Sequence, residues 1–306
     1  MFILIFNQLL KMLIIMVLAF ACYRLKIVNQ EGNKTVSNLL LMVVNPCLII
    51  TAYQTEYDAD LVHGLLLAFA AACVTHIIGI LVSTVCLPAK GHPQIGLERY
   101  AAIYSNCGFI GIPLVYSVLG NEGVFYLTAY MAVFNLFSWT HGLLLMTDSF
   151  SLKQLKKGLL SPMVIATVIA VVFFFIKFSI PAVLLDSMNY IADMNTPMAM
   201  MVAGFSVAQA DLRKLFVNFR IYLISFVKLL VIPFVVLLVL FLCRIDSTVA
   251  YTTLIAAACP TAATLTMFAI RFEKDYSYAS EIFSLSTVLS MISIPIITFA
   301  AGFLLK

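Results

Sequence analysis

An apolar stretch of the chain is interrupted by residues that are poor choices for an ordinary membrane helix. Asn106-Cys-Gly-Phe-Ile-Gly-Ile-Pro113 lies inside an apolar span that runs from about Tyr100 to Leu119. Pro113 lacks an N–H, and its ring crowds the carbonyl of Phe109. Lipid cannot satisfy a freed backbone group, so a break is tolerated only beside protein or a water-filled cavity. The stretch predicts a discontinuous helix whose ends carry partial charge; a simple proline kink with small packing residues is the alternative.

A second break is expected at Cys259-Pro260. Half-helices that begin after Pro113 and Pro260 can present free N–H groups and positive dipole ends to a carboxylate. Neutral polar side chains near the two breaks add hydrogen-bonding groups. The predicted binding residues are Asn106, Cys107, Gly108, Gly111, Pro113, Pro260, Thr261, Thr264, Asn45 and Lys228.

Lys228 is the ionisable member of this set. It follows Arg220 by eight residues, which is about 12 Å of helix at 1.5 Å per residue. Ionisable residues at such depth are functional candidates, so Lys228 is expected to supply positive potential, with snorkelling to the headgroups as the alternative. Lys11 is expected to pair or to snorkel outward, Glu281 to be interfacial or paired, and His76 to be structural.

The composition identifies a polytopic membrane protein. Hydrophobic residues make up 63% of the chain and charged residues only 10%, against roughly 25% charged in soluble domains. Ten apolar spans can be drawn, each near the roughly 20 residues that cross a bilayer. They are 2–22, 36–54, 62–86, 99–119, 122–146, 159–178, 186–209, 216–242, 248–270 and 277–303.

The basic residues are distributed unevenly between the two ends of these spans. Thirteen Lys and Arg residues lie on one side and three on the other. Because cytoplasmic loops carry the excess of positive charge, a multi-pass protein of the cell membrane with both termini outside the cytoplasm is predicted. The net charge of +4 is thus a topology signal, and no nucleic-acid partner is expected. The seven cysteines show no metal-ligand spacing, so no metal or cofactor is predicted.

Interruptions recur at corresponding places in two halves of the chain. Pro46 and Pro197 are 151 residues apart, and Pro113 and Pro260 are 147 apart. Both offsets are close to half the chain, which predicts two five-helix repeats. Because five is odd, the second repeat enters the membrane from the opposite side. The predicted domains are residues 1–152, a cytoplasmic linker at 153–157, and an inverted repeat at 158–306.

Four stretches, in order along the whole chain, resemble the auxin efflux carrier family, which includes plant PIN carriers and bacterial malate and malonate permeases. The first is 106–113 followed by Gly120-Asn-Glu-Gly123. The others are Asn195-Thr-Pro-Met-Ala-Met-Met-Val-Ala-Gly-Phe-Ser206, Lys228-Leu-Leu-Val-Ile-Pro233 and Pro260-Thr-Ala-Ala-Thr264. The chain lacks the long cytoplasmic loop of many plant members, and it has Thr264 where many relatives have an Asn.

The resemblance implies an all-α fold of ten transmembrane helices. Helices 1, 2, 6 and 7 would form a scaffold, and helices 3–5 and 8–10 a transport domain in which broken helices 4 and 9 cross. It also implies efflux or exchange of small organic anions, such as carboxylates or auxin-like acids, and a homodimer through the scaffold. Sliding of the transport domain against the scaffold would then give alternating access to the crossover.

Other function classes remain as alternatives. A cation/proton antiporter of similar architecture needs ion-binding carboxylates beside the crossover, and Val124–Met146 contains no Asp or Glu. A sodium-coupled bile-acid-type carrier is the closer rival, because carbonyls and hydroxyls can hold sodium. An enzyme is not predicted, since the sequence has no HExxH, no GxSxG and no carboxylate pair.

Overall fold

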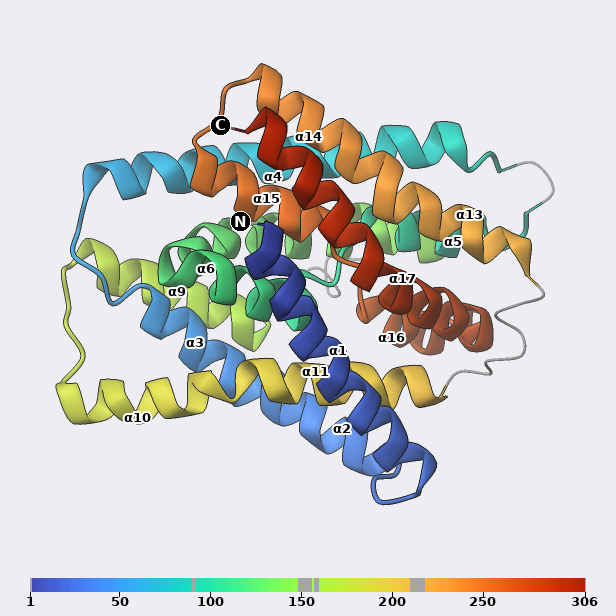
Figure 1. Ribbon diagram of the computed structural model, residues 1–306, viewed down its shortest axis with the longest axis horizontal. Helices are drawn as coiled ribbons and strands as arrows, with labels where there is room; N and C mark the ends of the chain where they lie inside the picture. The colour runs from blue at the N-terminus through green and yellow to red at the C-terminus, as the bar shows by residue number, and fades with distance from the viewer. Residues whose placement is uncertain (1, 90–91, 148–155, 157–159, 210–217, 306) are drawn as a thin grey trace.

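The computed structural model describes residues 2–89, 92–147, 156, 160–209 and 218–305, and its regular elements in these ranges are helices (Figure 1). Apart from Lys156, the predicted linker 153–157 lies outside the described residues. In the first half the helices are α1 (Phe2–Arg24), α2 (Gln30–Leu39), α3 (Asn45–Ala52), α4 (Ala59–Cys86), α5 (Ile95–Ile103), α6 (Ile112–Phe137) and α7 (Leu143–Thr147). In the second half they are α9 (Pro162–Phe175), α10 (Ala182–Asp193), α11 (Asn195–Gln209), α13 (Phe219–Phe226), α14 (Ile232–Leu242), α15 (Ser247–Ala258), α16 (Thr264–Arg271) and α17 (Tyr276–Leu304).

Within the described part of the chain, six continuous helical segments are long and apolar enough to cross a membrane. They are Ile3–Arg24, Gln30–Ala52, Ala59–Cys86, Cys107–Thr147, Phe219–Leu242 and Tyr276–Leu304; Pro162–Phe175 and Ser247–Ala258 are shorter apolar helices. The segment from Cys107 joins two helices across a kink at Gly120, where φ is +63°. Glycine adopts this conformation without a Cβ penalty. The chain is therefore an all-helical polytopic membrane protein.

Helices from distant parts of the sequence pack against one another (Figure 1). α1 packs on α11 and α17, and α3 packs on α9 and α10. α4 packs on α6 and α15, while α14 packs on α4 and α15. The α1–α11 contact is close, because a Cβ added at Gly204 would lie 2.3 Å from the carbonyl oxygen of Met16.

Three prolines follow a short π-helical segment, in which the helix widens by one residue. The segments Leu40–Val44, Cys107–Gly111 and Val227–Val231 each end two residues before a proline, at positions 46, 113 and 233. A proline ring crowds the carbonyl four residues back, and a five-residue hydrogen-bond spacing relieves this crowding. The prediction that Pro46 and Pro113 interrupt their helices was therefore wrong: each lies in the first turn of the helix that follows the widened segment.

The helices are interrupted at positions close to the prolines in the sequence. α5 ends at Ile103 and the π-helical segment starts at Cys107, so the first break is at Tyr104–Asn106, at the N-terminal end of the predicted stretch 106–113 and not at Pro113. The second break separates α15 from α16 at Cys259–Ala263, as Pro260 predicted. A third interruption separates α10 from α11 at Met194, three residues before Pro197.

Candidate functional site

The two main breaks lie against each other. Ser105 and Thr261 form an antiparallel bridge. The N–H of Asn106 donates to the carbonyl of Pro260 at 2.7 Å, and the N–H of Ala262 donates to the carbonyl of Tyr104 at 2.8 Å. Backbone groups released by breaking two helices are thus paired with one another, as buried backbone groups require. We call this crossing of residues 104–106 and 259–263 the crossover.

Local sequence explains why each helix stops there. The residue before a proline is pushed away from helical angles, and Cys259 has φ −58° and ψ 149°. On the other crossing segment, Asn106 acts as a helix N-cap, because its side-chain Oδ1 accepts a hydrogen bond from the N–H of Phe109 at 3.3 Å. Asparagine is among the strongest N-cap residues. Its side chain therefore fixes the point at which the next helical segment begins.

A cavity of about 600 Å³ opens beside the crossover. Of the predicted binding residues, Asn106, Cys107, Gly108 and Thr264 line it. The opposite wall comes from α2 and α11 and includes Asn33, Ser37, Asn38, Ser206 and Gln209. Asn135, Trp139, Met163 and Phe283 also line it. The sequence did not single out this polar wall, although α2 is unusually polar for part of a membrane-spanning segment.

Asn106 lines this cavity and carries an unused hydrogen-bond donor. Its Nδ2 is buried and has no hydrogen-bond partner, and the side chain is only 4% exposed. Leaving a buried amide donor unpaired costs about 1–3 kcal/mol, so an acceptor on a ligand would relieve a real penalty. The next residues, Cys107 and Gly108, begin a helical segment, and N–H groups in a first helical turn have no intrahelical acceptor. The site can therefore donate several hydrogen bonds to one anionic group.

Thr264 lies at the start of α16 on the same cavity. Its Oγ1 forms a 2.8 Å hydrogen bond with the hydroxyl of Tyr100, which also contacts Ser138 Oγ at 2.7 Å. The hydroxyl of Thr264 is thus held in a fixed position by the first half of the chain. It remains next to the cavity but is already hydrogen-bonded.

Lys228 lies behind the crossover and does not line the cavity. The side chain is 0% exposed, so it does not snorkel. Its Nζ donates to Ser105 Oγ at 2.5 Å and to the carbonyls of Ile103 and Ala257 at 3.4 Å each. Lys228 therefore ties both crossing segments together, and Ser105 separates its ammonium group from the cavity.

The remaining predicted residues of the crossover are also buried within it. Thr261 donates from Oγ1 to the carbonyl of Ala101 at 3.0 Å, and its N–H is bound by Ser286 Oγ at 3.2 Å. A Cβ at Gly111 would lie 3.4 Å from the Sγ of Cys259, so glycine allows the two segments to approach. Pro113 and Pro260 are buried as well. These residues shape the crossover rather than face the cavity.

Asn45 lies apart from the crossover, in a pair with Asn195. The Nδ2 of Asn195 donates to the Oδ1 of Asn45 at 2.6 Å, and both side chains are buried. Asn45 lies directly before Pro46, and Asn195 lies two residues before Pro197. The residues next to these two prolines thus meet in space.

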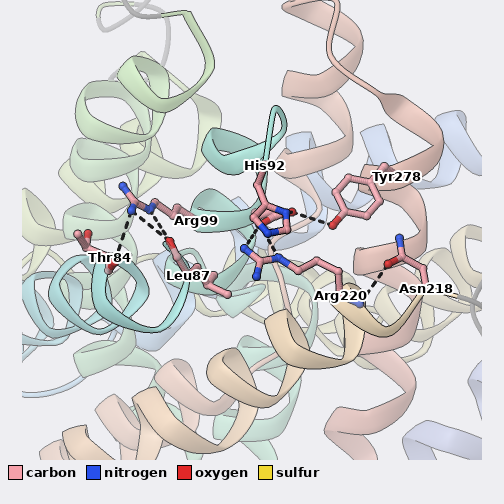
Figure 2. A network of polar contacts seen from close by, with 8 residues as sticks. Thr84, Leu87, His92, Arg99, Asn218, Arg220 and Tyr278 are labelled. Atoms are coloured by element: carbon pink, nitrogen blue, oxygen red, sulfur yellow. Dashed lines mark hydrogen bonds and ion pairs between the residues drawn. The ribbon is translucent and has the colours of Figure 1, made fainter. Parts of the chain in front are cut away.

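The sequence reasoning missed an ion-pair network whose side chains His92, Arg220 and Tyr278 lie close together in Figure 2. Glu98 is the partner that they share. Glu98 is 2% exposed, and its Oε2 accepts from Nε of Arg220 at 3.0 Å and from Nη2 at 2.7 Å. The hydroxyl of Tyr278 donates to Oε1 at 3.0 Å, and His92 Nδ1 lies 4.0 Å from Oε1. Neighbouring Arg99 donates to the carbonyls of Thr84 and Leu87 at the end of α4. Glu98 therefore joins α5, α13 and α17 at one point.

Three other ionisable residues that the sequence singled out, Lys11, Glu281 and His76, lie in other parts of the fold. Lys11 is exposed on α1. Glu281 is buried and accepts a hydrogen bond from Ser277 Oγ at 3.2 Å. His76 is buried with Nδ1 2.8 Å from the carbonyl of Ala72 and with rings of Tyr130 and Phe137 beside it. None of these three side chains lines the cavity.

Comparisons with known proteins place the sequence among membrane transporters. The sequence model of the family described as membrane transport protein matches residues 4–151 and 146–298. An uncharacterized transporter of Methanothermobacter thermautotrophicus is 24% identical over 293 residues, which cover 92% of this chain and 94% of the relative. The family resemblance of the sequence is confirmed. The chain belongs to the membrane transport protein family, which is the auxin efflux carrier family of transporters.

Proposed function

We propose that this protein is a secondary transporter that carries small organic anions across the cell membrane, by efflux or exchange. The observation that carries the proposal is the unpaired Nδ2 of Asn106 at the cavity beside the crossover. Among the described residues, no Asp or Glu side chain lines this cavity. A carboxylate would accept hydrogen bonds from Asn106 and from the N–H groups of Cys107 and Gly108, and charge-assisted bonds of this kind are stronger than neutral ones.

The proposed architecture is two inverted five-helix repeats, residues 1–152 and 158–306. Contacts between equivalent positions support it: Asn45 bonds Asn195, and Ser105 pairs with Thr261. In this view the scaffold consists of α1, α2–α3, α9 and α10–α11, and the transport domain consists of α4–α7 and α13–α17. The cavity has walls from both groups, which suits a substrate held where the two bodies slide.

Orientation and assembly complete the proposal. Both termini would lie outside the cytoplasm, as the distribution of basic residues predicts. A homodimer would form through the scaffold helices. The sodium-coupled carrier and the cation/proton antiporter are the competing functions that an experiment must separate.

Flux through liposomes that contain the pure protein tests the proposal. Labelled malate, malonate and an indole carboxylic acid should be offered with and without sodium. We expect uptake of at least one of these anions, weaker uptake in Asn106→Ala, and still weaker uptake in Asn106→Asp, because the new carboxylate repels an anion. Asn189→Asp on exposed α10 is the matched control and should behave as wild type. Cation uptake that Asn106→Asp increases, with no anion uptake, would overturn the proposal.

A further inference from the structure

The charge distribution of the cavity is uneven. Among the described residues that line it, Lys34 is the only one with a formally charged side chain. Lys34 lies on α2, and its exposed side chain contrasts with buried Asn106 at the crossover. The lining of the cavity therefore combines one solvent-accessible ammonium group with uncharged buried donors.

The helix that carries Lys34 is fixed in place. Asn33 Nδ2 donates to Ser206 Oγ on α11 at 3.4 Å, and Ser37 Oγ donates to the carbonyl of Asn33 at 2.8 Å. The residues of α2 that line the cavity include Gln30, Asn33, Lys34 and Ser37. Their spacing of three and four residues places them on one face of α2. Lys34 is thus part of a polar face that α2 presents to the cavity.

We propose that Lys34 is an outer anion-recruiting residue, which attracts the substrate into the cavity before Asn106 binds it. This inference rests on the proposed transport of organic anions. An exposed ammonium attracts an anion through water without a fixed contact, and charges of one sign along a cleft raise the local concentration of ligand. Neutral donors at the inner end then hold the anion without a permanent opposite charge, so it can also leave.

Other charged groups on the helix do not cancel this attraction by direct pairing. Glu31 lies three residues before Lys34, but it does not line the cavity, and the two side chains form no ion pair. Lys26, in the turn after α1, is exposed and does not line the cavity either. Lys26 therefore provides a control with the same charge and a different position.

The size of the effect follows from the interaction of two charges in water. When the Lys34 ammonium group and the anion are about 7 Å apart in water, removal of the lysine charge should raise the apparent KM for the anion roughly threefold. Reversal of the lysine charge should raise it roughly eightfold. Salt should weaken both effects, because the screening length falls from about 30 Å at 0.01 M salt to about 8 Å at 0.15 M and 3 Å at 1 M. An effect that operates through buried contacts would be screened much less.

The test compares initial uptake rates and equilibrium binding of whichever of malate, malonate or an indole acid the wild-type protein carries. Lys34→Gln and Lys34→Glu should raise KM and Kd by about threefold and eightfold at about 0.01 M salt, and the curves should converge with wild type near 1 M. Lys34→Arg should match wild type, and so should Lys26→Gln. Circular dichroism and thermal unfolding would show that each variant is folded.

The outcomes separate this inference from the proposed function. If wild type carries an anion but Lys34→Gln is unchanged at low salt, the recruiting role is overturned and the proposed function stands. An equal effect of Lys26→Gln would also overturn it, because general surface charge would then explain the result. A wild-type protein that carries none of the anions overturns both.

Discussion

Arg220 and Glu98, which are 122 residues apart, form a paired hydrogen-bonded contact at 3.0 and 2.7 Å. The pair joins α13 of the second half to α5 of the first half. α5 has only nine residues, and isolated helices shorter than about 12 residues are marginal. Its position, and hence that of the crossover at its C-terminal end, depends on such contacts with neighbouring helices.

We expect Glu98→Gln to destabilise the protein. Breaking a buried ion pair costs about 3–5 kcal/mol, and the Arg220 side chain is 17% exposed, so a value near the lower limit is expected. Thermal unfolding in detergent measures the change. Arg220→Gln should cost a similar amount, and the double variant should cost less than the sum of the two. Additive effects would show that the pair contributes nothing.

Lys228→Gln should lower stability and transport together. Its Nζ binds Ser105 and two carbonyls at the crossover, and each acceptor left unpaired costs about 1–3 kcal/mol. Asn106→Ala should weaken transport more than stability, because it removes an Nδ2 donor that has no protein partner together with the Oδ1 cap on Phe109, whose loss costs about 0.5–2 kcal/mol. Flux and thermal unfolding of both variants would check this difference. A fully stable Lys228→Gln protein with weak anion binding would assign Lys228 to the substrate instead.

Pro260 at the crossover and Pro113 in α6 should differ in effect when each is replaced by alanine. Alanine favours a helix interior by about 3 kcal/mol over proline, so Pro260→Ala should let α15 continue and should disturb the bond from Asn106 to the carbonyl of residue 260. Pro113 lies in the first turn of α6, where proline is tolerated, so Pro113→Ala should have the smaller effect. Uptake assays with matched membrane insertion would compare them. Equal loss of transport in both would contradict this interpretation.

Alternating access predicts labelling of Cys107 that depends on side and substrate. Cys107 lines the cavity although it is only 2% exposed, whereas Cys259 is 0% exposed and does not line the cavity. In a background without other cysteines, a membrane-impermeant thiol reagent should modify Cys107 from each side under different conditions. Substrate should slow that reaction. Cys259 alone should react poorly throughout, and labelling of Cys107 from one side only, despite measured transport, would contradict alternating access at this crossover.

The sequence by itself determined the class of protein and much of its organisation. Its composition indicated a membrane protein, because a chain with 63% hydrophobic and only 10% charged residues cannot cover its apolar segments with polar surface. The spacing of Pro46, Pro113, Pro197 and Pro260 marked the segments in which helices are widened or broken. Four of the predicted binding residues, Asn106, Cys107, Gly108 and Thr264, line one cavity, and their role in binding stays a prediction.

Tertiary structure decided which of these residues face the cavity. A proline marks the neighbourhood of a break but not its exact position, because a widened helical turn can absorb the missing hydrogen bond; the first break therefore lies at Tyr104–Asn106 and not at Pro113. Three features depend on contacts between residues more than 100 positions apart: the burial of Lys228, the Glu98–Arg220 ion pair, and the position of the polar wall of α2. Local periodicity carries no information about such contacts, so only the folded chain reveals them.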